Sequence, residues 1–73
     1  MPLIEATLTV GRSPNALREL ITALTDAVVS TGVAPRESVR VIIREVPAEH
    51  FAAGDVTIAE RRAAAAASPN IEA

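Results

Sequence analysis

Residues 2–14 of the 73-residue chain read PLIEATLTVGRSP, and within this stretch one structural period ends and another begins. Apolar and polar side chains alternate from Ile4 to Val10. This period of two is typical of a β-strand. We therefore expect a strand over residues 2–10, which Gly11 ends.

A helix is expected directly after this strand. Ser13 is a suitable N-cap, and Pro14 suits the first helical position because the N–H that proline lacks would have no partner there. Gly32 is a natural C-cap and Pro35 prevents continuation, so the helix should cover about residues 14–31. Apolar side chains recur between these limits at helical spacing, at Leu17, Leu20, Ile21, Leu24 and Val28.

A second strand is expected from Ser38 to Val46. Apolar residues occupy both of its faces, which is typical of a strand that is covered on both sides, as in parallel sheets. A strand, a long helix and a second strand make one β-α-β unit of the α/β class. Two strands and one helix cannot bury both faces of a sheet, so we expect other subunits to complete the core.

A loop or short hairpin over residues 50–55 is expected after Pro47, which breaks the second strand. Beyond it, Thr57 and Glu60 fit a capping box. The helix that this box opens should cover about residues 58–67, where six alanines also favour helix.

The length of the chain allows one small domain, which we assign to residues 1–67, followed by a flexible tail over residues 68–73. The chain has no cysteine and one histidine, so we expect no disulfide and no thiolate or zinc metal site. Association with partner subunits is the remaining way to stabilise so short a chain.

Composition also argues against two kinds of partner. A net charge of −2 and a single aromatic residue do not fit a nucleic-acid-binding protein. No segment is long and apolar enough to cross a membrane, and the N-terminus lacks the basic region and apolar run of a signal peptide. We therefore expect no nucleic acid, no membrane and a cytoplasmic location.

Pro2 is the first candidate for chemistry. We expect Met1 to be removed, because methionine before a small residue is normally trimmed, which would free the secondary amine of Pro2. An α-amino group titrates near ~7.7–8.0, and burial in an apolar pocket or a nearby cation lowers that pKa further. Such an amine suits general acid–base catalysis at neutral pH. Taken alone, however, a proline after the start methionine is common and needs no functional explanation.

Arg12, just past the first strand, and Arg40, near the start of the second, are candidates for binding a carboxylate. One guanidinium could hold the carboxylate while the other stabilises charge on an enolate oxygen. In a parallel pair these positions lie at opposite ends of the sheet, so a shared site would combine different subunits. Phe51 could wall the pocket and exclude water. On spacing alone, the arginines are better explained as surface residues, and Phe51 equally well as a core residue.

Together these features resemble the 4-oxalocrotonate tautomerase family over nearly the whole of residues 2–55. The matching segments are Met1-Pro2, Gly11-Arg12-Ser13, Ser38-Val39-Arg40-Val41-Ile42-Ile43 and His50-Phe51. No one segment is specific, but their joint spacing is. The resemblance implies a single β-α-β tautomerase fold with parallel strands and a short C-terminal helix, assembled into a homohexamer that is a trimer of dimers.

The resemblance also implies an activity, that of a cofactor-independent keto–enol tautomerase of small unsaturated 2-hydroxy or 2-oxo carboxylic acids. Pro2 would be the amino-terminal base that moves a proton between carbons. Arg12 would bind the distal carboxylate, and Arg40 of a neighbouring subunit would engage the 2-oxygen and the nearby carboxylate. Phe51 would form the apolar wall. Many members of the family serve the breakdown of aromatic compounds.

Several features depart from the family pattern. Thr9 stands where the best-known members carry an apolar pocket residue, and the alanine-rich extension from Arg61 is longer than in the shortest members. Dehalogenase and hydratase relatives place a water-activating carboxylate shortly after the loop, where this chain has Ala52 and Ala53. A dehalogenase, hydratase or decarboxylase of the same superfamily and a non-catalytic oligomeric protein are the alternatives.

Overall fold

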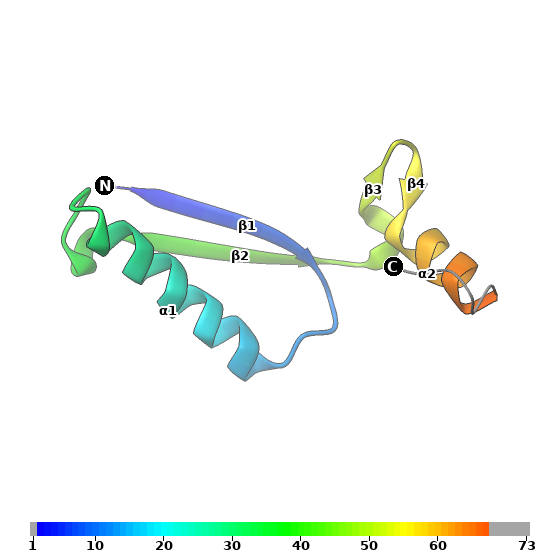
Figure 1. Ribbon diagram of the computed structural model, residues 1–73, viewed down its shortest axis with the longest axis horizontal. Coiled ribbons are helices and arrows are strands. Elements are labelled where there is room, and N and C mark those ends of the chain that lie inside the picture. Colours follow the sequence, from blue (N-terminus) through cyan, green and yellow to red (C-terminus); the bar gives the residue numbers. More distant parts are fainter. Residues whose placement is uncertain (1, 68–73) are drawn as a thin grey trace.

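The computed structural model describes residues 2–67, and the tail assigned to residues 68–73 lies outside them. A helix, α1, lies against one face of a sheet formed by β1 and β2, and a smaller unit of β3, β4 and α2 extends beyond one end of that sheet (Figure 1). In chain order the elements are β1 (Leu3–Thr9), α1 (Pro14–Ser30), a 3₁₀ turn (Arg36–Ser38), β2 (Arg40–Val46), a second 3₁₀ turn (Ala48–His50), β3 (Ala52–Ala53), β4 (Val56–Thr57) and α2 (Ile58–Ala67).

α1 begins where the sequence predicts and ends within one residue of the predicted position. The Ser13 side chain accepts a hydrogen bond from the Ala16 N–H at 3.1 Å, which confirms Ser13 as the N-cap. Thr31 is the C-cap, and Gly32 follows it with a φ of +77°, the left-handed conformation that commonly ends a helix. Neither α1 nor α2, as described within residues 2–67, has the length and apolar character that a membrane crossing requires.

β1 and β2 pair in parallel, with Leu3 opposite Arg40 and Thr9 opposite Val46. This pairing, with α1 between the strands in sequence, confirms the predicted β-α-β unit. β2 begins two residues later than predicted, because the chain first forms a 3₁₀ turn in which the Ser38 N–H donates to the backbone carbonyl three residues earlier.

The segment after β2 forms a hairpin and then a helix, as predicted. β3 and β4 pair antiparallel. The Thr57 N–H donates to Glu60 Oε1 at 2.9 Å and the Glu60 N–H donates to Thr57 Oγ1 at 3.0 Å, so the capping box is confirmed. The Ile58 N–H donates to the Phe51 carbonyl oxygen at 2.8 Å, which holds the start of α2 beside the chain that enters the hairpin.

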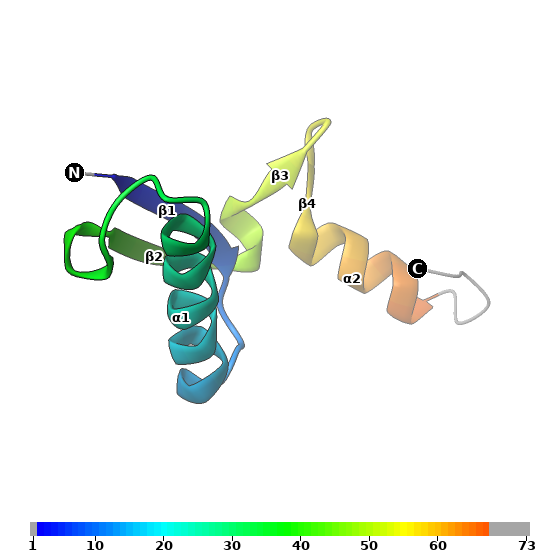
Figure 2. The same cartoon turned by 60° about the vertical axis from the view of Figure 1, so that its left-hand side comes forward.

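The single chain has a thin core. Among residues 2–66, no apolar side chain is fully buried. Val41 and Ile43 are half-buried on one face of β2, whereas Arg40, Ile42 and Arg44 on the other face are exposed. One chain by itself therefore covers one face of β2, and the expected cover of the other face by a partner subunit stays a prediction. The molecule is elongated (Figure 2), with a radius of gyration of 16.2 Å against about 11 Å for a compact domain of this length.

Candidate active site

Pro2 and Arg40 are neighbours at the amino end of the parallel sheet. The Arg40 N–H donates to the Pro2 carbonyl oxygen at 3.0 Å, directly before the pairing of Leu3 with Arg40. Pro2 is half-buried and Arg40 is exposed. One chain therefore brings together two of the three residues that the sequence predicts to be catalytic.

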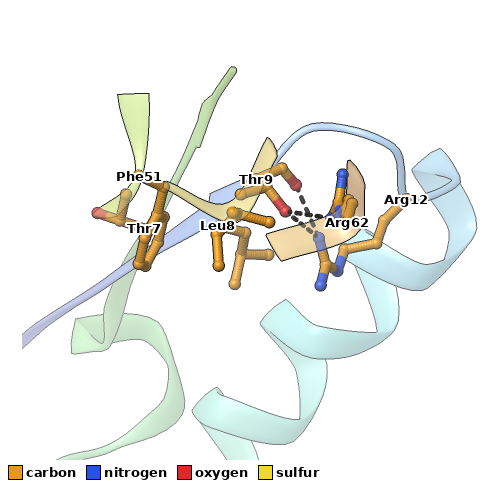
Figure 3. A pocket seen from close by; sticks show the side chains of 7 residues that line it. Thr7, Leu8, Thr9, Arg12, Phe51 and Arg62 are labelled. Atoms are coloured by element: carbon orange, nitrogen blue, oxygen red, sulfur yellow. Dashed lines mark hydrogen bonds between the residues drawn. The ribbon is translucent and has the colours of Figure 1, made fainter. Parts of the chain in front are cut away.

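Arg12 and Phe51 lie at the opposite end of the sheet, where they line a pocket of about 270 Å³ (Figure 3). The pocket is formed by the end of β1, the loop after it, the approach to the hairpin and the first part of α2. Its lining residues are Thr7, Leu8, Thr9, Arg12, Phe51, Ile58 and Arg62. Four residues of β1, Leu3 to Ala6, lie between Pro2 and the first lining residue, Thr7, so Pro2 stands roughly 17 Å from the near edge of the pocket along the strand.

Thr9 is the one buried residue among residues 2–66, with 6% of its surface exposed. By the alternation of β1, Thr9 belongs to the sheet face that α1 leaves open, but side chains from beyond the strand cover it. Arg12 Nη1 donates to the Thr9 carbonyl oxygen at 2.7 Å and to Thr9 Oγ1 at 3.2 Å. Arg62 Nη2 donates to the same Oγ1 at 3.2 Å. Two guanidinium groups therefore converge on one threonine (Figure 3).

Phe51 supplies the only aromatic side chain of the protein and is half-buried. In Figure 3 it lies on the other side of Leu8 from the two arginines. The backbone bond from the Ile58 N–H to the Phe51 carbonyl oxygen fixes the main chain at this position. The pocket thus has an apolar part and a cationic part, and none of its lining residues is a carboxylate. Such a lining suits a small anion with an apolar body.

Sequence reasoning did not single out Arg62, although a signal for it was present. The capping box sets Ile58 as the first residue of α2, and residues four apart share one face of a helix. Ile58 and Arg62 both line the pocket, whereas the neighbouring Arg61 donates to the Ala53 carbonyl oxygen at 3.2 Å. The sequence pattern does not predict the path of the hairpin, and this path turns the face of α2 that carries Ile58 and Arg62 toward the end of β1.

The prediction of no metal site rests on the lack of cysteine and on the single histidine of the sequence. Within the part of the chain that the structure describes, no group of three or more histidine, aspartate or glutamate side chains is placed to hold a metal ion. The cationic character of the pocket also opposes cation binding there.

Comparison with known proteins identifies the class of this fold and pocket. The family model for tautomerase enzymes matches residues 2–61, and the chain belongs to the tautomerase family. A probable tautomerase of Ralstonia nicotianae is 57% identical over 56 residues, which cover 77% of this chain and 80% of the relative.

The solved structures that are similar to this chain include 4-oxalocrotonate tautomerases, the group that the sequence resembles. TomN, a 4-oxalocrotonate tautomerase homologue of the tomaymycin biosynthetic pathway, has a TM-score of 0.81 and 48% identity, over 85% of this chain and 95% of that one. A heterohexameric 4-oxalocrotonate tautomerase from Chloroflexus aurantiacus has a TM-score of 0.77 and 38% identity, over 82% and 97% of the two chains. The predicted membership of the 4-oxalocrotonate tautomerase family is confirmed.

Proposed function

We propose that this protein is a cofactor-independent keto–enol tautomerase of small unsaturated 2-hydroxy or 2-oxo carboxylic acids. The observation that carries the proposal is a pocket with two guanidinium groups and no carboxylate, in a chain of the tautomerase family. Tautomerisation moves one proton from oxygen to carbon and shifts a double bond. It therefore requires a base, a means of stabilising an enolate and a way to hold the acid.

Each of these tasks has a candidate residue. The free amine of Pro2, after removal of Met1, takes the proton from the 2-hydroxyl group and returns it to carbon. Arg40 engages the 2-oxygen and the adjacent carboxylate and stabilises the negative charge that develops on that oxygen. Arg12 binds the distal carboxylate. Phe51 walls the pocket and excludes water, which strengthens both charge interactions.

The site in this proposal is shared between subunits. Pro2 and Arg12 stand at opposite ends of β1, too far apart to contact one small acid. The open sheet face carries exposed Leu3 and Ile42, 50% and 42% accessible, as a face that packs against another chain would. A solved relative is a heterohexamer. We propose a homohexamer, a trimer of dimers, in which one subunit brings its pocket to the amino end of another.

Among related reactions, hydration and hydrolytic dehalogenation have the least support. Both need a group that activates water, and a carboxylate is the usual choice for such a general base. The residues of this chain that line the pocket include none, and the two positions after Phe51 are Ala52 and Ala53. Proton transfer within one bound acid has no such requirement.

The decisive experiment is the substitution Pro2→Ala. Alanine is also small, so removal of Met1 is retained, but the rigid secondary amine is replaced by a primary one. We expect the rate of ketonisation of a 2-hydroxydienoate to fall by about 10²- to 10⁴-fold. The intact mass of both proteins should show that Met1 is absent, and their circular dichroism should agree. A variant that turns over at the rate of the parent contradicts the proposal.

A further inference from the structure

We propose that Thr9 is a positioning residue and Arg62 a second anion-binding residue of the pocket. The Thr9 hydroxyl holds the Arg62 guanidinium beside that of Arg12, so that a carboxylate entering the pocket contacts both. The inference rests on the proposed function in that it concerns the same bound acid. The inference goes further because the proposed function gives no role to Thr9 or to Arg62.

The hydrogen bonds around Thr9 make the first argument. A threonine hydroxyl has two lone pairs, and in this chain both arginines donate to it, each at 3.2 Å. A guanidinium carries five N–H donors, so each arginine keeps donors for a ligand after these bonds are made. Thr9 itself is buried, which fixes the point on which the two side chains converge.

The charges make the second argument. Arg12 and Arg62 lie close together, and the only group that the bonds to Oγ1 place between them is a neutral hydroxyl. No lining residue of the pocket is acidic. Both guanidinium groups lie within hydrogen-bonding distance of the same oxygen, so their like charges repel each other, and an anion bound between them offsets that repulsion. A planar carboxylate can accept parallel hydrogen bonds from guanidinium groups, which makes it the natural ligand for the pair.

The connection through the chain makes the third argument. The bond from Arg62 to Thr9 joins residues 53 apart in sequence and ties α2 to the end of β1. An apolar side chain in place of Thr9 could accept a hydrogen bond from neither guanidinium. Arg12 would keep its bond to the backbone carbonyl oxygen of residue 9, whereas Arg62 would lose its bond to the hydroxyl. The hydroxyl therefore decides whether Arg62 of α2 contributes its charge to the pocket. The capping box of Thr57 and Glu60 fixes where α2 begins, and with it the helix face on which Arg62 lies.

The test measures binding of adipate and hexanoate, two acids of equal chain length of which only adipate has a second carboxylate. The single carboxylate of hexanoate is expected at Arg40 of the neighbouring subunit, with its apolar end in the pocket. Isothermal titration calorimetry of the assembled protein should therefore show that Arg62→Gln weakens adipate binding about tenfold and hexanoate binding less than twofold. Thr9→Val should reproduce most of this loss of adipate affinity, whereas Thr9→Ser, which keeps the hydroxyl, should bind adipate like the parent. In the double variant of Thr9→Val and Arg62→Gln, the loss of binding free energy should be less than the sum of the two single losses.

The matched control is Arg61→Gln, which removes the same charge from the adjacent position of α2. It should leave the ratio of the adipate and hexanoate dissociation constants unchanged. The inference is overturned if Arg61→Gln and Arg62→Gln act alike, if Thr9→Val has no effect, or if the parent protein does not prefer adipate.

Turnover separates this inference from the proposed function. With a 2-hydroxydienoate that carries a distal carboxylate, Arg62→Gln should raise KM and leave kcat unchanged. A parent protein that prefers adipate but does not ketonise any enol overturns the proposed function alone. A parent protein that ketonises enols but loses nothing with Arg62→Gln overturns this inference alone. Gel filtration and circular dichroism of each variant should match the parent, and Arg62 and Arg61 are both exposed, so neither change disturbs a core.

Discussion

The two ends of the β1–β2 sheet differ in how much of a site one chain completes. At the carboxyl end, β1, the approach to the hairpin and α2 enclose a pocket around the buried Thr9. At the amino end, Pro2 and Arg40 share a backbone hydrogen bond but line no part of that pocket. Under the proposed function, one end therefore holds the acid and the other acts on it. If that function holds, the activity belongs to an assembly of subunits, because the two ends of the sheet in one chain lie a full strand length apart.

After Pro2→Ala, the largest effect on activity is expected when one arginine is removed at either end of the sheet. Arg12→Gln and Arg40→Gln should each lower kcat/KM by about 10²- to 10³-fold, since each removes a charged hydrogen-bond donor to the bound acid. When the two inactive proteins are unfolded, mixed in equal amounts and refolded together, about a quarter of the sites should combine an intact Arg12 from one chain with an intact Arg40 from another. The measurement is ketonisation of a 2-hydroxydienoate before and after mixing.

Each variant refolded by itself is the control for this mixing experiment and should remain inactive. Mixed protein with no more activity than its components would mean that the two arginines do not combine across a subunit boundary. The two ends of the sheet would then not form one shared site, although the pocket around Thr9 would be unaffected.

The local elements were predictable from the sequence because their signals lie within a few residues of one another. Ser13 caps α1, and Thr57 with Glu60 caps α2, where short-range rules place them. Only some of the residues that line the pocket could be predicted from the sequence. Arg12 and Phe51 were expected there, whereas Arg62 reaches it through a bond that spans 53 residues. Such a contact depends on the turn of the hairpin, and no short-range pattern encodes that direction.

The open face of the sheet lies between the two ends, and a charge placed on it should have the second-largest effect. Ile42 is 42% exposed in the single chain and pairs in register with Glu5. If another subunit covers this face, Ile42→Asp buries an unpaired carboxylate and should destabilise the assembly by about 3–5 kcal/mol. Light scattering after gel filtration should show a smaller particle, and activity should fall because the shared site comes apart.

Val33→Asp is the matched control, because it makes the same change at an apolar residue that is 68% exposed in the loop after α1. It should leave both particle size and activity unchanged. An Ile42→Asp protein that keeps the size of the parent would mean that the open face is not the contact that brings the two ends together.

The smallest effect concerns two ion pairs that look alike in the single chain. Arg44 pairs with Glu5 on the open sheet face, and Arg36, in the 3₁₀ turn after α1, pairs with Asp26 of α1. The side chains are 53% and 44% exposed in the first pair and 57% and 55% in the second. Exposed pairs contribute about 0.2–1 kcal/mol and weaken with salt. In the isolated chain, Glu5→Gln and Asp26→Asn should therefore have equally small effects on stability.

Assembly should make the two ion pairs unequal. A subunit that covers the open face would exclude water from the pair of Arg44 and Glu5, so Glu5→Gln would leave Arg44 without its partner in a drier environment. The effect of Glu5→Gln on thermal unfolding should then exceed that of Asp26→Asn and should persist in about 1 M salt, roughly seven times physiological ionic strength, where surface pairs are screened. Equal effects with equal salt dependence would mean that the open face stays in water. The pair of Arg44 and Glu5 therefore reports whether the open sheet face joins one chain to the next.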